Sequence, residues 1–145
     1  MQIEIRQVSY REHEETLMKI REQVFILEQG VPRDVEIDGQ DFNASHFLAT
    51  RNTDVIGSAR LLPSGQIGRM AVLPEFRSQG IGFRLLEFVI AYAFSSGFAH
   101  LFLHAQSHAI SFYEKAGFGA AGEEFMEAGI AHVEMHKSKE SVENP

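Results

Sequence analysis

Apolar residues recur along this chain with two spacings that alternate. Short runs with strand-like alternation or continuous apolar character fall at residues 2–8, 46–50, 55–62, 66–73, 100–104, 118–122 and 130–136. Apolar residues recur every three or four positions, as on one face of a helix, at residues 10–29, 81–96 and 107–116. Residues 123–129 fit neither pattern, and we expect a turn or loop there that faces the substrate side. Residues 28–41 are acidic and irregular, with room for a short helix.

The order of these segments predicts the fold class. The predicted order is β-α-β-β-β-α-β-α-β-β, and its runs of consecutive strands exclude a doubly wound fold. We therefore expect an α/β sandwich with a central mixed sheet. A chain of 145 residues has the size of one domain. We expect that single domain over residues 1–137, followed by a polar tail at residues 138–145.

Composition removes several classes of function. There is no cysteine, which excludes a thiol nucleophile, a disulfide framework and a zinc–thiolate site. The seven histidines form no paired ligand motif, so we expect no metal. A net charge of -7 argues against nucleic acid as a partner. No leader and no apolar run of membrane-spanning length is evident, so we expect no membrane association and a cytoplasmic location.

One stretch, residues 68–94, carries the clearest chemistry. An apolar strand stops at Pro74, a glycine-spaced loop runs from Arg77 to Gly82, and a long apolar helix follows. Glycines let backbone N–H groups converge without a Cβ in the way, and the helix dipole adds positive potential at the same point. The pattern is typical of an anion cradle, most simply for phosphate. A tight connection without a ligand is the alternative, because two glycines alone are a weak signal.

The order strand, proline, arginine, Gly-x-Gly and helix resembles the acetyl-CoA motif of the GCN5-related N-acetyltransferase (GNAT) family, Arg/Gln-x-x-Gly-x-Gly/Ala. A second GNAT motif, Asn-x-x-Ala-x-x-x-Tyr-x-x-x-Gly-Phe, is matched in residues 106–118 at Ala109, Tyr113, Gly117 and Phe118, with Gln106 in place of the usual Asn. Residues 21–29, 38–41 and 125–132, with His46 and Met135, resemble the ElaA/YjcF-like branch. The resemblance implies a GNAT-type fold, with a mostly antiparallel sheet, helices on both faces, and splayed fourth and fifth strands.

By this resemblance, the chain would transfer an acetyl group from acetyl-CoA, as acyl-donor cosubstrate, to a primary amine by direct attack in a ternary complex. The resemblance assigns cofactor binding to Met70, Ala71, Val72, Leu73, Arg77, Ser78, Gln79, Gly80, Ile81, Gly82, Phe83, Gln106, Phe112 and Tyr113. Within this set, the Val72 N–H would polarise the thioester carbonyl. The Tyr113 phenol would protonate the departing thiolate as a general acid.

The acceptor side is less defined. We expect Glu28 and His104 to bind the acceptor, a small-molecule or peptide amine, and a homodimer is a further expectation. The general base stays open among His104, Glu28, a residue of the last strand (His132 or Glu134) and water. The acidic residues 28–41 are expected to flank the acceptor entrance, either attracting an ammonium ion or forming a solvated loop. Arg60 and Arg69 have two interpretations, as cleft residues or as surface or salt-bridged arginines.

Two other functions fit part of the pattern. A non-catalytic acyl-CoA-binding or sensor domain would share the fold and the cofactor motif. A nucleotide-phosphate binder would use the cradle alone and leave Tyr113 and its motif unexplained.

Overall fold

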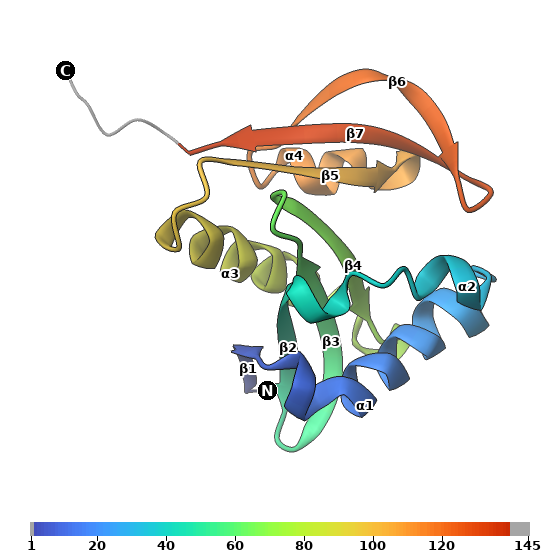
Figure 1. Ribbon diagram of the computed structural model, residues 1–145, viewed down its shortest axis with the longest axis vertical. Helices are drawn as coiled ribbons and strands as arrows, with labels where there is room; N and C mark the ends of the chain where they lie inside the picture. The colour runs from blue at the N-terminus through green and yellow to red at the C-terminus, as the bar shows by residue number, and fades with distance from the viewer. Residues whose placement is uncertain (1, 140–145) are drawn as a thin grey trace.

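The computed structural model describes residues 2–139, which form one mixed sheet with helices against it (Figure 1). The strands are β1 (Ile3–Val8), β2 (Ser45–Arg51), β3 (Asp54–Leu61), β4 (Gln66–Val72), β5 (His100–Gln106), β6 (Gly119–Glu127) and β7 (Ile130–Ser138). The α-helices are α1 (Tyr10–Arg21), α2 (Arg33–Glu36), α3 (Ile81–Ser95) and α4 (Ile110–Glu114). A π-helix covers Glu22–Glu28, and short 3₁₀ segments cover Asp41–Asn43, Pro74–Phe76 and Ser107–Ala109.

The seven strands lie in the order β1-β2-β3-β4-β5-β7-β6. Every neighbouring pair is antiparallel except β4 and β5, which are parallel. That pair is joined by the crossover helix α3, as a parallel connection requires. The predicted mixed, mostly antiparallel sheet is therefore confirmed.

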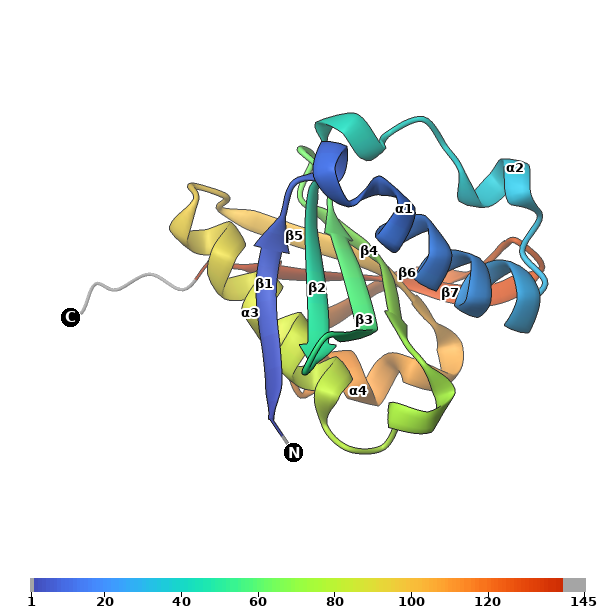
Figure 2. The ribbon, with the colours of Figure 1, turned by 90° about the horizontal axis from the view of Figure 1, so that it is seen from below.

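Helices cover both faces of the sheet, as the resemblance implied (Figure 2). Successive residues of a strand point to opposite faces, and β2 shows this directly. Phe47 belongs to the large core cluster that contains Leu85 and Leu86 of α3, whereas Leu48 packs with Leu17 of α1. Helix α4 packs its half-buried Phe112 against the same cluster as α3. The sheet is thus the middle layer between α1 and α3.

The fourth and fifth strands diverge soon after they meet. Strand β4 pairs with β5 only at Gln66↔Phe102 and Ile67↔Leu103. Beyond Ile67 the ladder between the two strands ends, and Figure 1 shows β5, β7 and β6 turning away from the layer formed by β1 to β4. The predicted splay is confirmed. It leaves one edge of β4 without a strand partner over its second half.

A bulge in β4 accompanies this divergence. Ser58 faces Ala71 and Arg60 faces Gly68, so β4 contains one residue more than β3 between these two pairs. Within the bulge, Arg69 has φ 49°, in the left-handed region that favours glycine. A non-glycine residue there costs of order 1–3 kcal/mol, which surrounding contacts must offset. The side chain of Arg69 provides such contacts, as described below.

Several predicted boundaries need correction. The helix expected over residues 10–29 is α1 followed by the π-helix, and the helix expected over 107–116 is a 3₁₀ turn followed by the short α4. The loop expected at 123–129 is wrong, because β6 continues to Glu127 and only Ala128 and Gly129 form the turn. Strand β6 is an exposed edge strand, so apolar alternation is not needed to form it. Ser138 lies in β7, and residues 140–145 of the predicted tail lie outside the described residues.

Candidate active site

The glycine-spaced loop and the start of α3 line an open cavity. Its wall is formed by Val72, Arg77, Ser78, Gly80, Gly82, Phe83, Phe112 and Lys115. Gly80 has φ 82° and precedes the helix, and a Cβ added there would meet nothing within 4 Å. Glycine is therefore required at this position by its backbone conformation, not by crowding. Gly82 lies under Phe112 and Val72, where a Cβ would make ordinary contacts.

The amino end of α3 supplies backbone donors to this cavity. The first helical bond is the one from the Arg84 N–H to the Gly80 carbonyl, at 3.1 Å. The N–H groups of Ile81, Gly82 and Phe83 precede it, so they have no acceptor within the helix, and no side chain caps the helix. Two cations, Arg77 and Lys115, line the same cavity. Free N–H groups, a helix dipole and two positive side chains together fit a polyphosphate.

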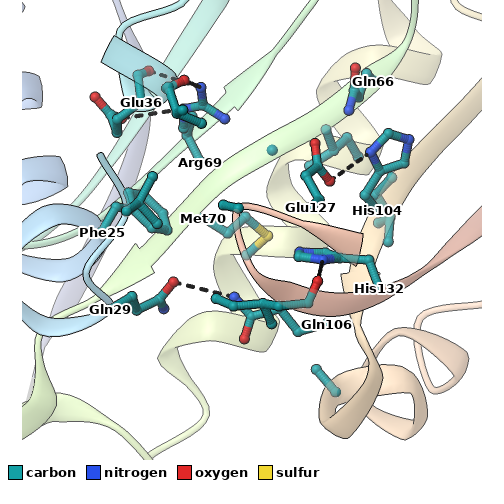
Figure 3. A pocket seen from close by; sticks show the side chains of 18 of the residues that line it. Phe25, Gln29, Glu36, Gln66, Arg69, Met70, His104, Gln106, Glu127 and His132 are labelled. Atoms are coloured by element: carbon teal, nitrogen blue, oxygen red, sulfur yellow. Dashed lines mark hydrogen bonds and ion pairs between the residues drawn. The ribbon is translucent and has the colours of Figure 1, made fainter. Parts of the chain in front are cut away.

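A second cavity, of about 270 Å³, lies where β4 and β5 diverge (Figure 3). One wall comes from the N-terminal helices and includes Phe25, Gln29 and Glu36. The opposite wall comes from β5 to β7 and α4, and includes His104, Gln106, Tyr113, Glu127 and His132. Met70 of β4 also lines this cavity and lies between the two walls in Figure 3, two residues before Val72 of the first cavity. Strand β4 therefore runs from one cavity to the other.

The backbone of Val72 faces the gap between β4 and β5. The Leu73 N–H donates to the Ile56 carbonyl at 2.9 Å, which makes Leu73 a hydrogen-bonded partner of β3. Because such pairs alternate in an antiparallel ladder, the next residue, Val72 opposite Gly57, turns its N–H and C=O away from β3. An acceptor entering the gap could take this N–H as an added strand would.

Arg77 connects three parts of the site. Its Nε donates to the Val72 carbonyl at 2.8 Å, and its two Nη atoms donate to the two carboxylate oxygens of Glu28 at 2.7 Å each. Glu28 ends the π-helix and lines neither cavity. The hydrogen bond from Arg77 lowers the pKa of the Glu28 carboxyl. The glycine loop, the end of β4 and the N-terminal helices are thus held together by one guanidinium.

Tyr113 lines the second cavity and packs edge-to-face against Phe112 and Phe118. Burial raises the pKa of its phenol to about 12. A thiol has a pKa of about 8.5, so the Tyr113 phenol is the weaker acid. It would stabilise a thiolate mainly by donating a hydrogen bond.

Two carboxylates of the acidic segment, Glu36 and Asp41, are buried and paired with arginines. Arg21, itself 1% exposed, donates from Nε to Glu36 Oε2 at 2.6 Å and from Nη1 to Asp41 Oδ1 at 2.8 Å. Arg60, also buried, donates to Asp38 at 2.9 Å and to Asp41 at 3.1 Å. The buried carboxylates therefore neither attract an ammonium ion nor lie in a solvated loop. Arginines from distant parts of the sequence neutralise their charge, and no spacing in the sequence predicted these pairs.

Arg69 ties the same segment to the bulge of β4. Its Nη2 donates to the Glu36 carbonyl at 2.8 Å and to Asp38 Oδ2 at 3.2 Å, and Arg69 also lines the second cavity (Figure 3). Of the two interpretations of Arg60 and Arg69, Arg60 is a buried ion-pair residue, and Arg69 is both salt-bridged and a cleft residue. The contacts of Arg69 hold its left-handed backbone in place.

The β5 side chains in the second cavity are held by polar contacts. His104 Nδ1 lies 3.1 Å from Glu127 Oε1, and His104 Nε2 lies 3.3 Å from Glu134 Oε1. Gln106 donates to Gln29 Oε1 at 3.3 Å, which joins β5 to the end of the N-terminal helices. In residues 2–139, no group of three or more His, Asp or Glu side chains is arranged to hold a metal ion. No helix in that range is long and apolar enough to cross a membrane.

Comparison with known proteins decides the family. The family model of the acetyltransferase (GNAT) domain matches residues 9–139. This chain belongs to the GNAT family. A putative acetyltransferase of Bacillus subtilis is 33% identical over 144 residues, which is 95% of this chain and 98% of that protein. The uncharacterized N-acetyltransferase YjcF of the same organism is 34% identical over 81% of this chain and 87% of YjcF.

Solved structures agree with this assignment. Escherichia coli ElaA superposes with a TM-score of 0.85 at 27% identity, over 94% of this chain and all of ElaA (100%). A putative N-acetyltransferase from Lactobacillus plantarum has a TM-score of 0.87 at 26% identity, over 95% of this chain and 99% of that one. The GNAT fold and the resemblance to the ElaA/YjcF-like branch are confirmed.

The GNAT residues predicted from the sequence fall into two groups. Those that line a cavity are Met70, Val72, Arg77, Ser78, Gly80, Gly82, Phe83, His104, Gln106, Phe112 and Tyr113. Those that line neither cavity are Glu28, Ala71, Leu73, Gln79 and Ile81. Ala71 and Ile81 are buried in the core, so only their backbone groups could meet a ligand.

Sequence reasoning missed several cavity residues. Lys115 lies two positions after Tyr113, within the second motif, and its charge beside a phosphate-type loop was the available signal. Gln66 also lines the second cavity, and neither sequence motif includes it. Glu127 was not predicted as a site residue, because residues 123–129 were expected to form a loop and not the end of β6.

Proposed function

We propose that this GNAT protein transfers an acetyl group from acetyl-CoA to a primary amine by direct attack in a ternary complex. The observation that carries the proposal is the free edge of β4. It begins where the β4–β5 ladder ends at Ile67, presents the backbone of Val72 to the gap, and leads to the glycine loop before α3. Pantetheine is an amide-bearing chain and can pair with such an edge, while the pyrophosphate binds the helix end.

Each residue then has a defined part in the proposal. Backbone N–H groups from Arg77 to Phe83, with the charges of Arg77 and Lys115, hold the phosphates. The Val72 N–H donates to the thioester oxygen as negative charge develops there. Tyr113 donates a hydrogen bond to the departing thiolate. The amine approaches through the second cavity. A cytoplasmic location and a homodimer stay predictions.

Thiol release from acetyl-CoA against a panel of primary amines tests this function. The wild-type chain should acetylate at least one amine, and Tyr113→Phe should lower kcat about 10- to 100-fold, by loss of one hydrogen bond to a charged group or of the proton donor. Calorimetry should show unchanged acetyl-CoA affinity for Tyr113→Phe. Gly80→Glu should abolish acetyl-CoA binding, because its left-handed backbone disfavours a side chain and the new carboxylate repels phosphate.

The second candidate, an acyl-CoA-binding sensor domain, gives a different result. It would bind CoA tightly, turn over no amine of the panel, and show no change with Tyr113→Phe. Failure of the wild-type chain to bind CoA, with Gly80→Glu behaving in the same way, would remove both candidates.

A further inference from the structure

The turn between β6 and β7 brings a carboxylate to the wall of the second cavity. Glu127 is the last residue of β6 and pairs with Ile130 across the two-residue turn. Ala128 and Gly129 in this turn have φ 52° and 76°, the left-handed pair that a tight hairpin requires. Alanine in that conformation costs roughly 1–2 kcal/mol. Glu127, Ala128 and Ile130 all line the cavity, so a strained, well-defined turn places Glu127 there.

Glu127 differs from the other carboxylate on this cavity. Within residues 2–139, the acidic side chains that line the cavity are Glu36 and Glu127. Glu36 is paired with two guanidinium groups, those of Arg21 and Arg69. Glu127 has an imidazole, His104, as its partner and is about half exposed, with a side chain 48% accessible. It is the acid on this cavity that can accept a proton without leaving a buried arginine unpaired.

A path for that proton leads away from the cavity. His104 faces Glu127 with Nδ1 and Glu134 with Nε2, at 3.1 and 3.3 Å. Glu134 is the cross-strand partner of His104 on β7, and its other oxygen lies 2.7 Å from His136 Nε2. Glu134 and His136 are partly exposed to solvent. An imidazole can accept a proton at one nitrogen while it releases one from the other, so the arrangement carboxylate–imidazole–carboxylate connects cavity and solvent.

The two carboxylates of this path, Glu127 and Glu134, are the main electrostatic contacts of the His104 ring. Phe102 of β5 and Phe125 of β6 pack against its ring with centroids at 6.2 and 5.0 Å. The charged groups within ion-pair distance are Glu127 from β6 and Glu134 from β7. The cation on the β4 wall of the cavity, Arg69, is itself bound to carboxylates of the segment at residues 33–41.

We propose that Glu127 is the general base of the acetyl transfer and that His104 and Glu134 carry its proton to solvent. This inference rests on the proposed function. The acceptor ammonium gives one proton to the Glu127 carboxylate, and the neutral amine forms the N–C bond to the thioester carbon. The C–S bond breaks, and the thiolate, which accepts a hydrogen bond from Tyr113, receives the second proton of the nitrogen. Glu127 passes its proton to His104 Nδ1 as His104 Nε2–H protonates Glu134, which releases it to water.

The pH dependence of kcat/KM distinguishes a base from a structural residue. With the best amine of the panel, Glu127→Gln should lower kcat/KM at pH 7 about 100-fold or more. The loss should shrink as pH rises toward the pKa of a free alkylamine, about 10, because the amine then enters without the proton. Glu123→Gln, the same change at an exposed position of β6, is the matched control and should follow the wild-type profile.

His104→Gln sharpens the test. Glutamine keeps a hydrogen-bonding side chain beside Glu127 but cannot relay a proton, so its loss in kcat should be smaller than that of Glu127→Gln and also relieved at high pH. Acetyl-CoA affinity, measured by calorimetry, should be unchanged in all variants. A wild-type rate for Glu127→Gln, or a deficit that stays constant from pH 7 to about pH 10, would overturn the assignment of the base alone. Absence of turnover by the wild-type chain would remove the proposed function, and this inference with it.

Discussion

Two groups of carboxylates, each with one member on the wall of the second cavity, differ in what balances their charge. Glu36, Asp38 and Asp41 are bound by arginines, whereas Glu127 and Glu134 are bound by His104 and His136. Arginine keeps its charge at every pH at which a protein is folded, but histidine gains and loses a proton near neutrality. The partners of the first group therefore hold their charge, whereas the partners of the second group can take up and give back a proton during a reaction.

The difference also shows how a charged stretch of sequence can mislead. Residues 28–41 contain five acids and one arginine, Arg33, which suggested a negative entrance for a cationic acceptor. In the folded chain their partners come from elsewhere, Arg21 from α1 and Arg60 from β3. The local charge of a segment is not the charge of the surface that it forms.

The largest expected effect comes from breaking the first group. Arg21→Met removes a buried guanidinium and leaves Glu36 and Asp41 without one partner each. The loss of one member of a buried ion pair costs about 3–5 kcal/mol. Arg33→Met is the matched control, because Arg33 pairs with Glu22 at the exposed surface and should contribute at most about 1 kcal/mol. Chemical denaturation measures both, and equal stability of the two variants would contradict the structural role of Arg21.

Acid should weaken the same group at a defined pH. Burial raises the pKa of Asp38, but hydrogen bonds and charge from Arg60 outweigh it and lower the pKa to about 2. The folded pKa is below the unfolded value of about 3.9, so the stabilisation is fully present above pH 4 and is lost as pH falls toward about 2. After allowance for solvent screening, we expect about 1–2 kcal/mol from Asp38.

Unfolding by urea at several pH values measures this loss, and Asp38→Asn provides the comparison. The variant lacks the carboxylate, so the fall in its unfolding free energy between pH 4 and about pH 2 should be smaller than that of the wild-type chain. Parallel curves for the two proteins would show that other groups account for the acid sensitivity.

The fold could be predicted from the sequence because its strands and helices repeat apolar residues with clear periods. The end of α3 follows a second rule, that glycine often ends a helix. The chain turns at Gly97 with φ 104°, and the Phe98 N–H donates to the Ala93 carbonyl. Strand β6 could not be predicted in full, because a bulge between Ala121 and Phe125 interrupts its alternation.

The site was predictable only where a local motif defines it. The loop from Arg77 to Gly82 is such a motif. Arg21 had a weaker signal, since it lies on the apolar stripe of α1 beside Leu17 and Ile20, where a charge must find a partner. Its partners lie in an irregular segment without periodicity, and no spacing rule could connect them.

Glu28 differs from both groups of carboxylates, because it is exposed and yet bound to an arginine, Arg77. An exposed pair contributes at most about 1 kcal/mol, so Glu28→Gln should change the unfolding free energy by less than that. The same substitution frees Arg77 and removes a negative charge near the first cavity, which the glycine loop lines. Acetyl-CoA should therefore bind more tightly, by less than about fivefold. Glu22→Gln, at the other end of the same π-helix, is the control and should leave acetyl-CoA affinity unchanged. The contrary result is a several-fold higher KM for a cationic amine with unchanged acetyl-CoA affinity. Glu28 would then recruit the acceptor, as its sequence context predicted, and its pairing with Arg77 would not affect cofactor binding.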